Sequence, residues 1–322
     1  MNGRPLPAAT AESADDSASS RMLDVIGDSW SLQIVTLAFC GVSRFESWRQ
    51  RLGISRAVLQ NRLSHLVAQG VLNTTPDRSR PYALSPMGLA LFPTVLAMWR
   101  WELKWLGRLS CGAAIVHKPC GEPLSVHYGC SACNDEISFR NSVHSFDAQS
   151  LARAAKATRN RRAALSSRPL GQGPVADIVG DRWSFMVMGK IMQGVRRFDG
   201  IVGETGVATN ILADRLAQLQ AAGVVERRPA AERADWFDYY PTPAGEDLFP
   251  IRLEMYFWGD AWLASPGEIL PLCYHAPCGA QLKPQPRCAC CERPLTAQDL
   301  RINLVSLLDL RTDPQAQDLS QG

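Results

Sequence analysis

The chain contains one sequence unit twice, and this duplication constrains its fold more than any other feature. Residues 24–31 (Asp-Val-Ile-Gly-Asp-Ser-Trp-Ser) recur as residues 177–184 (Asp-Ile-Val-Gly-Asp-Arg-Trp-Ser), an offset of 153 residues. The matches continue at this offset as far as Gly70-Val71, which recurs as Gly223-Val224. Because the matches keep one order over such a length, the chain is a duplication, and both copies should share one fold.

Length and composition agree with two globular domains. The 322 residues correspond to two domains of about 150 residues each. The net charge of +3 is small, so a surface for nucleic acid has to come from local clusters of basic residues. The chain has no apolar signal segment and no apolar run of about 18 residues, so we expect a cytoplasmic protein whose ten cysteines are mostly reduced.

Each copy has the pattern of three helices. In the first copy, residues 30–39 predict a buried helix ended by Gly41, and residues 44–52 predict a short amphipathic helix. Ser55 is a typical N-cap for a third helix, in which three leucines repeat on one face (Leu59, Leu63 and Leu66).

A β-hairpin and a long aromatic helix follow these helices. Residues 71–75 and 82–84 predict the two strands of the hairpin. This order is typical of a winged helix-turn-helix, in which the third helix enters the major groove of DNA and the hairpin reaches the backbone. The aromatic helix, over about residues 87–109, is expected to join the two copies, with plain core packing as the alternative.

The expected fold class is therefore mainly α with small β wings (α+β): two winged helix-turn-helix domains, each followed by a small zinc-ribbon-like segment. The predicted boundaries are a disordered tail (1–20), the first winged domain (21–110), a first zinc-binding-like segment (111–141), a basic linker (142–173), the second winged domain (174–265), a second zinc-binding-like segment (266–306) and a tail (307–322).

The candidate DNA contacts lie on the third helix and on the wing of each copy. For the first copy they are Ser55, Arg56, Gln60, Asn61, Arg62, Arg78 and Arg80, and for the second copy Thr209, Asn210, Arg215, Arg227 and Arg228. For Arg62 and Arg215, an internal ion pair is an equal alternative to a phosphate contact.

The two copies differ at these positions. The second copy has Ala213 and Asp214 where the first has Gln60 and Asn61, and its hairpin mixes arginines with acids. Acidic side chains against phosphates are unfavourable. We therefore expect helix 55–66 to read bases and helix 208–219 mainly to position the protein.

These residues resemble the HxlR-type winged helix-turn-helix transcriptional regulators, here in a tandem form. The motifs that carry the resemblance are Gly27, Trp30, Gly41, Arg44-Phe45, Ile54-Ser55, Leu59, Arg62-Leu63, Leu66, Gly70-Val71 and residues 84–88, with their counterparts in the second copy. The resemblance implies a regulator that binds double-stranded DNA. Because the family binds as homodimers, it also implies a pseudo-dimer within one chain, and it leaves a homodimer of the whole chain open.

A second repeated block follows each winged unit, with the pattern His-x2-Cys-x9-Cys-x2-Cys at an offset of 158 residues. Two residues between ligands let both side chains converge on one ion, and four nitrogen and sulfur ligands suit a closed, structural zinc site. We expect up to two zinc ions, held by His117, Cys120, Cys130 and Cys133 in the first block and by His275, Cys278, Cys288 and Cys291 in the second.

Some alternatives stay open at this point. Cys290 could replace Cys291, His127 could compete with His117, and the cysteines could instead be merely buried or form a disulfide. Cys40 is expected to be a small apolar filler, with redox sensing as the alternative.

An enzyme is not expected, because the sequence has no phosphate-binding loop, no nucleophile elbow and no paired carboxylates in a motif. The alternatives to a plain DNA-binding regulator are a winged-helix protein-interaction module and a regulator that responds to thiol oxidation or to a small-molecule effector.

Overall fold

The structure is a computed structural model that describes residues 17–77, 81–145, 175–230, 233, 235–268 and 272–305. Arg78 and Arg80 of the first wing lie outside the described residues, as do most of the basic linker and both predicted tails apart from residues 17–20.

The first half has the predicted order of elements, preceded by one helix that the sequence did not predict and that begins within the predicted tail 1–20. Helices α1 (Ala18–Ile26), α2 (Ser29–Phe39), α3 (Phe45–Leu52) and α4 (Arg56–Ala68) precede a hairpin of β1 (Leu72–Thr74) and β2 (Tyr82–Leu84). The predicted aromatic helix is divided into α5 (Pro86–Leu89) and α6 (Phe92–Trp105). Pro93 explains the division, because it lacks a backbone N–H and is tolerated only in the first turn of a helix.

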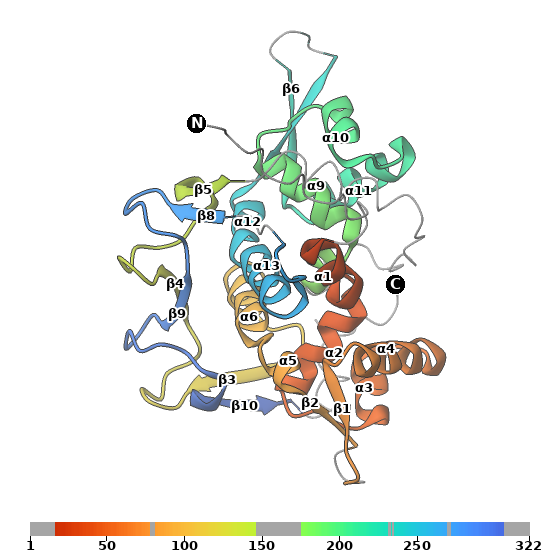
Figure 1. The fold of residues 1–322 in the computed structure, drawn as a ribbon, viewed down its shortest axis with the longest axis vertical. Coiled ribbons are helices and arrows are strands. Elements are labelled where there is room, and N and C mark those ends of the chain that lie inside the picture. Colours follow the sequence, from red (N-terminus) through yellow and green to blue (C-terminus); the bar gives the residue numbers. More distant parts are fainter. Residues whose placement is uncertain are drawn as a thin grey trace, which may run out of the picture.

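The second half repeats these elements. Helices α8 (Ala176–Val179), α9 (Arg182–Met192), α10 (Phe198–Thr205) and α11 (Thr209–Ala221) precede β6 (Val225–Pro229) and β7 (Phe237–Pro241), and then α12 (Pro243–Glu246) and α13 (Phe249–Leu263) follow. The tandem of two winged units is thus confirmed, with one unit at each end of the molecule (Figure 1).

The two halves meet about an approximate twofold axis. Asp28 and Asp181, which occupy equivalent positions, form an antiparallel bridge with each other. Helices α6 and α13 pack together at the centre of the molecule, and their tryptophans make matching bonds. Trp101 Nε1 donates to the Ala244 carbonyl at 2.8 Å, and Trp258 Nε1 donates to the Met87 carbonyl at 2.9 Å. The aromatic helices therefore join the two units, as the sequence predicted.

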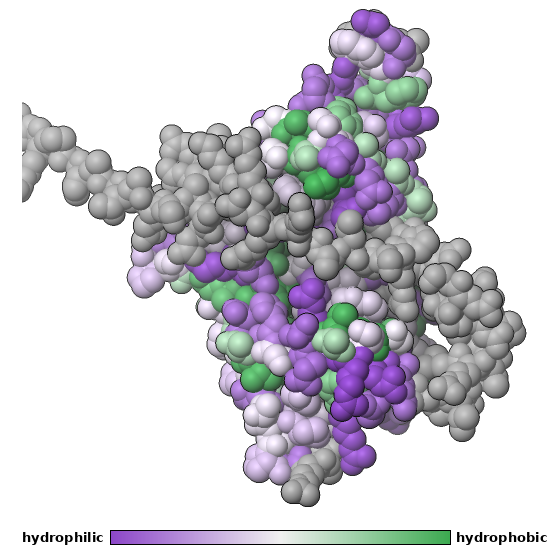
Figure 2. Space-filling view, turned by 90° about the vertical axis from the view of Figure 1, so that its right-hand side faces the viewer, coloured by the Kyte–Doolittle hydropathy of each residue, from purple (hydrophilic) through white to green (hydrophobic). Residues whose placement is uncertain are grey.

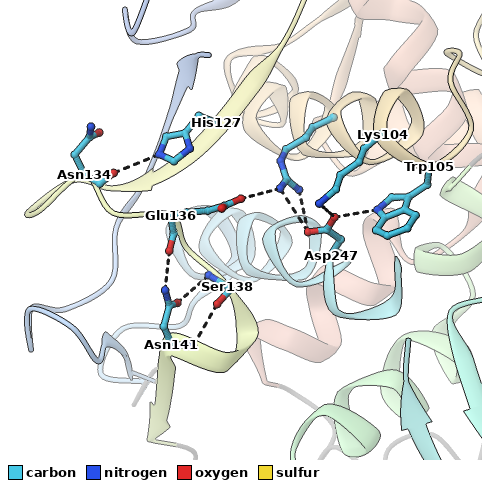
Figure 3. A network of polar contacts seen from close by, with 9 residues as sticks. Lys104, Trp105, His127, Asn134, Glu136, Ser138, Asn141 and Asp247 are labelled. Atoms are coloured by element: carbon cyan, nitrogen blue, oxygen red, sulfur yellow. Dashed lines mark hydrogen bonds and ion pairs between the residues drawn. The ribbon is translucent and has the colours of Figure 1, made fainter. Parts of the chain in front are cut away.

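A polar network on one side reinforces this junction (Figure 3). The Asp247 carboxylate, from the second half, contacts Arg100 at 3.4 Å and Lys104 at 2.5 Å on α6. Trp105 donates its indole N–H to the same carboxylate at 2.9 Å, and Arg100 also reaches Glu136 at 3.3 Å. The network thus connects three parts of the chain: α6, the residue after α12 and the segment that follows β4 (Val126–Cys130).

The segments after the two winged units do not form separate ribbons, which corrects the prediction. Each strand pairs with a strand of the other half: β3 (Ala113–His117) with β10 (Leu300–Leu304), β4 with β9 (Pro284–Cys288), and β5 (Ser142–Ser145) with β8 (Leu272–His275). Short 3-10 turns, η1 (Phe139–Asn141) and η3 (Ala297–Asp299), precede β5 and β10. The two segments are therefore one interleaved unit, drawn on the left of Figure 1.

The buried side chains form one apolar core that runs through both winged units and the interleaved strands. Among the described helices, none combines the length and the apolar character needed to cross a membrane.

Candidate functional sites

Helix α4 leaves its predicted recognition face uncovered. The Ser55 hydroxyl accepts a hydrogen bond from the Val58 N–H at 3.3 Å, which fixes the start of the helix. The three leucines of the buried stripe are fully inaccessible to solvent. The opposite face carries exposed side chains, which are Arg56, Ala57, Gln60, Asn61 and Ser64. A small polar face of this kind suits the edges of base pairs in a major groove.

Arg56 stands at the exposed start of this face. Its guanidinium lies 3.4 Å from the Glu46 carboxylate and 5.2 Å from the centre of the Phe45 ring. The Arg56 side chain is 80% exposed, and exposed ion pairs contribute little to stability. Arg56 can therefore exchange Glu46 for an external anion at small cost.

Helix α11 presents a weaker surface. Its N-cap, Ala208, has no side chain able to cap the helix. Thr209 and Asn210 are exposed, but Asp214 is exposed on the same helix. The second unit thus offers fewer donors and one acid where the first has only neutral and basic groups.

Arg62 and Arg215 both form internal ion pairs. The partner in each case is the aspartate at the N-cap of α2 or of its counterpart α9. Arg62 Nε lies 3.3 Å from Asp28, and Arg215 Nε lies 2.7 Å from Asp181. The Arg215 side chain is only 3% exposed, whereas that of Arg62 is 30% exposed. The structure thus places Arg215 in the internal ion pair that the sequence analysis gave as the alternative, whereas Arg62 stays partly accessible.

The second wing, β6 and β7, carries charges of both signs. Arg227 is exposed and stacks on the Phe237 ring at 4.5 Å, and Arg228 pairs with Glu226 on its own strand. At the tip of this hairpin, Arg233 pairs with Asp235 at 2.8 Å. Neighbouring acids thus neutralise part of the positive charge.

Helices α4 and α11 lie on the side of the molecule opposite the interleaved strands (Figure 1). Seen from that side, hydrophilic residues lie on the described surface at both ends of the molecule, with apolar patches among them (Figure 2). The two exposed helices therefore face one common side.

The eight predicted metal ligands do come together, as two clusters of four. The first cluster is His117, Cys120, Cys288 and Cys291, and the second is Cys130, Cys133, His275 and Cys278. Within each cluster all ligand atoms lie within 4.8 Å of one another.

The distances within the clusters fit a tetrahedral zinc ion. Two sulfurs bound to one zinc at about 2.3 Å are about 3.8 Å apart in a tetrahedron. The Sγ atoms of Cys120 and Cys288 are 3.8 Å apart, and those of Cys130 and Cys278 are 3.9 Å apart. Each histidine directs Nδ1 at its cluster, 3.2 Å from Cys120 for His117. The donor set and its spacing thus fit a closed four-ligand site.

The grouping of the ligands differs from the prediction. Each cluster takes the His-x2-Cys pair of one half and the Cys-x2-Cys pair of the other half, whereas the sequence analysis placed four consecutive ligands in one site. The nine residues between Cys120 and Cys130 include the extended strand β4, and a strand advances about 3.3 Å per residue. This strand therefore carries the second pair away from the first and places it beside the other half.

Each ligand pair closes in the same tight turn. The N–H of Gly121 bonds to the His117 carbonyl at 2.8 Å, and that of Asn134 bonds to the Cys130 carbonyl at 2.7 Å. The residue after the last cysteine has a positive φ in all four turns, which are at Gly121, Asn134, Gly279 and Glu292. Four equivalent turns agree with two equivalent sites.

The structure also shows which of the alternative candidate ligands lie in the clusters. Cys291 and His117 belong to the first cluster, whereas Cys290 is exposed and outside it. His127 instead contacts the Asn134 carbonyl at 3.3 Å (Figure 3).

One thiol contact was not foreseen. Cys40, at the end of α2, lies 3.9 Å (Sγ–Sγ) from Cys111, which precedes β3. The contact with Cys111, together with burial, raises the pKa of the Cys40 thiol. Since 71 residues separate the two cysteines and neither lies in the repeated pattern, the sequence held no signal for this pair.

The fold defines the class of protein: two winged helix-turn-helix units on one chain, each with an exposed third helix. The family model described as HxlR-like helix-turn-helix matches residues 25–110 and 178–266, more than half of the chain. The chain therefore belongs to the HxlR-like helix-turn-helix family.

Curated relatives agree with this membership. The chain is 32% identical over 139 residues to the uncharacterized HTH-type transcriptional regulator Mb3122 of Mycobacterium bovis, which covers 42% of this chain and 87% of that protein. It is 29% identical over 92 residues to the HTH-type transcriptional regulator YodB of Bacillus subtilis, which covers 28% of this chain and 81% of that protein. The crystal structure of PA1607 aligns with 30% identity and a TM-score of 0.37, covering 44% of this chain and 99% of that one.

Proposed function

We propose that the protein is a sequence-specific DNA-binding transcriptional regulator that acts as a pseudo-dimer within one chain. The observation that carries this proposal is the exposed polar face of α4, flanked by Arg56 and placed on the same side of the molecule as α11. Family membership supports it, because the curated relatives are HTH-type transcriptional regulators.

In this proposal the two units have unequal roles. Helix α4 enters a major groove and reads bases through Gln60 and Asn61, while Arg56 contacts phosphate. Helix α11 and the second wing mainly position the protein, through Thr209, Asn210 and the exposed guanidinium of Arg227. The operator is then asymmetric, with one specific half and one weakly specific half.

Selection of bound sequences from random DNA at two salt concentrations tests this function. We expect one conserved half-site, bound by one chain per operator. Replacing Gln60 and Asn61 by alanine should reduce the preference for that half-site by about 10-fold or more, since each bidentate base contact gives about 1–3 kcal/mol of discrimination. The matched control, Thr209→Ala with Asn210→Ala, should weaken binding to all sequences and leave the preference unchanged.

Two results would contradict the proposal. Binding that shows no sequence preference at either salt concentration removes the regulator function. Two equivalent half-sites, or two chains per operator, remove the unequal pseudo-dimer.

We further propose that each cluster holds one structural Zn²⁺. Three thiolates and one imidazole leave no open coordination position in a tetrahedral site, so the ion stabilises the fold and takes no part in catalysis. Burial opposes ionisation of Cys130, but the N–H groups of Ala132 and Cys133 outweigh it and lower the pKa of its thiol. A readily ionised thiol suits metal ligation.

Metal analysis of double variants distinguishes crossed sites from sites within one half. The wild type should contain two zinc ions per chain. In crossed sites, Cys120→Ser with Cys288→Ser removes ligands of one cluster and should leave one ion, whereas Cys120→Ser with Cys130→Ser damages both clusters and should leave none. The reverse pattern would show that each ion binds within one half. Cys290→Ser is the control and should retain both ions.

A protein-interaction role for the second unit is the alternative that one observation favours. The β6–β7 hairpin exposes Trp236 and Phe237, with exposed fractions of 42% and 36%. If this hairpin binds a protein partner, Trp236→Ala should leave the affinity for DNA unchanged, and its loss of function should appear only with the partner present.

A further inference from the structure

A cavity of about 60 Å³ lies between α9, α13, η1 and the start of β8 in the second half. Its walls are mostly apolar, from residues such as Phe139, Met192, Phe249 and Leu272. Its polar or charged lining residues include Arg252, Gln193, Tyr256 and Asp260. An apolar pocket with few polar groups is the usual form of a small-molecule site.

Arg252 is the unusual member of this wall. The residue is 6% exposed, and its guanidinium lies 3.8 Å from the centre of the Phe185 ring. It donates to the Phe185 carbonyl and, at 3.5 Å, to the Tyr256 hydroxyl. No carboxylate forms an ion pair with it in the part of the chain that the structure describes. A buried charge normally has an anionic partner, because its desolvation is otherwise costly.

The first half has no equivalent of this cation. By the repeat offsets, Arg252 stands where the first half has Val95, and Gly189 stands where it has Thr36. A Cβ atom on Gly189 would lie 2.4 Å from Nη2 of Arg252. The glycine therefore makes room for the guanidinium, and the two substitutions together create the cavity wall.

Asp260 occupies another part of the wall. Burial and the nearby Glu268 raise the pKa of Asp260 to about 6. Among the described residues, Asp260 forms no ion pair with Arg252. The guanidinium thus remains available to an anion that enters the cavity.

We propose that this cavity binds a small organic carboxylate, with the carboxylate against Arg252 and a short aliphatic body among the apolar side chains. The cavity of about 60 Å³ is partly open to solvent, so it favours a small ligand whose aliphatic end need not be fully enclosed. A carboxylate supplies the missing countercharge and can accept two parallel hydrogen bonds from a guanidinium.

The position of the cavity makes this ligand an effector of the regulator, a step that rests on the proposed DNA-binding function. The C-terminal end of α9 lines the cavity through Gly189, Met192 and Gln193. The N-terminal end of the same helix holds α11 through the Asp181–Arg215 pair. A ligand that shifts α9 therefore shifts the helix that positions the second unit on DNA.

Butyrate and butyramide, which have the same shape and differ in charge, test the binding step on the zinc-loaded full chain without DNA. In calorimetric titrations at constant ionic strength, butyrate should bind in the millimolar range and butyramide at least 10-fold more weakly. Equal affinities for the two compounds, or no binding of butyrate up to 50 mM, would overturn the proposal.

Variants locate the site. Arg252→Met should weaken butyrate binding at least 10-fold, whereas Arg49→Met, which changes an exposed arginine on α3, should not change it. If Arg252→Met does not fold, Gly189→Ala displaces the same guanidinium and should weaken butyrate binding. Butyrate binding that a folded Arg252→Met or Gly189→Ala variant retains unchanged would overturn the assignment.

A separate measurement tests whether the ligand changes DNA binding. Adding butyrate should change the affinity of the wild type for its selected DNA and leave that of Arg252→Met unchanged. If the protein binds butyrate but no DNA, the proposed function is contradicted and the carboxylate site still stands. If it binds DNA but no butyrate, only the carboxylate site is contradicted.

Discussion

The aspartate that caps α2 and its counterpart at α9 have kept the same arginine partner, but the surroundings of the two pairs have diverged. In the first unit the Asp28–Arg62 pair is partly exposed, and in the second unit the Asp181–Arg215 pair is buried. Coulomb attraction is weak in water and much stronger in the interior, while an unpaired interior charge is costly. The same Asp–Arg ion pair therefore contributes little to stability in the first unit and more in the second.

This difference predicts that replacing the arginine by methionine destabilises the two units by unequal amounts. Arg215→Met leaves Asp181 without its buried partner and should lower the free energy of unfolding by about 3 kcal/mol. The matched change Arg62→Met should cost at most about 1 kcal/mol, because its pair is partly exposed. Urea unfolding followed by circular dichroism measures both, and equal losses would contradict this account.

Glu254 gives a second prediction at this scale. Burial raises the pKa of this carboxyl to about 8. In the unfolded chain the carboxyl releases its proton above about pH 4.5, whereas in the folded chain it keeps the proton up to about pH 8. Its contribution to the free energy of unfolding therefore falls as the pH rises through this range, by up to about 1.4 kcal/mol per pH unit.

Glu254→Gln removes this dependence. Between pH 6 and 8 the variant should gain stability relative to the wild type as the pH rises, in unfolding measurements with zinc present. The exposed Glu46→Gln is the control and should track the wild type. A constant difference between Glu254→Gln and the wild type over this range would contradict the raised pKa.

At the scale of elements, α6 and α13 turn two winged units into one body. Each helix carries a tryptophan whose indole N–H reaches a carbonyl of the other half. Helix α1, which the sequence did not predict, also packs on α13 across the junction. The junction is thus made of helices and not of the chain between the halves.

Replacing either tryptophan by phenylalanine should therefore lower the free energy of unfolding by a similar amount. Trp101→Phe and Trp258→Phe each leave a carbonyl without its donor, and each should lower the free energy of unfolding by about 1 kcal/mol. Trp262→Phe, at a site 44% exposed, should change it little. A large loss for one tryptophan and none for the other would contradict the symmetric junction.

The repeat allowed most elements to be predicted, and the reason is local. Glycine turns, the Ser55 cap and the leucine stripe of α4 are short-range signals, and the structure has each of them. The pairing of strands between halves depends on contacts far apart in sequence, so the crossed clusters and the Cys40–Cys111 contact gave no such signal. The cavity beside Arg252 was missed for the same reason, since its walls come from four separate elements.

At the scale of the whole molecule, the interleaved strands hold both halves in one unit, and the proposed zinc ions would add two bridges between them. If a protease site is inserted between residues 151 and 174 and cut, the zinc-loaded halves should still elute together in gel filtration. Removing zinc with a chelator under reducing conditions should make the cut halves separate on dilution, since two of the bridges between them are then lost. Cut halves that separate with zinc bound would contradict the bridging role.

If the crossed clusters bind zinc as proposed, they also set an order of events during synthesis. When the ribosome has made only the first half, that half carries four thiol and imidazole ligands, but they belong to two different centres. The second centre gains its missing pair once Cys278 has emerged, and the first only after Cys291. Neither proposed ion can then be fully enclosed before the ligand pairs of the second half have been made, so tight metal uptake requires both halves.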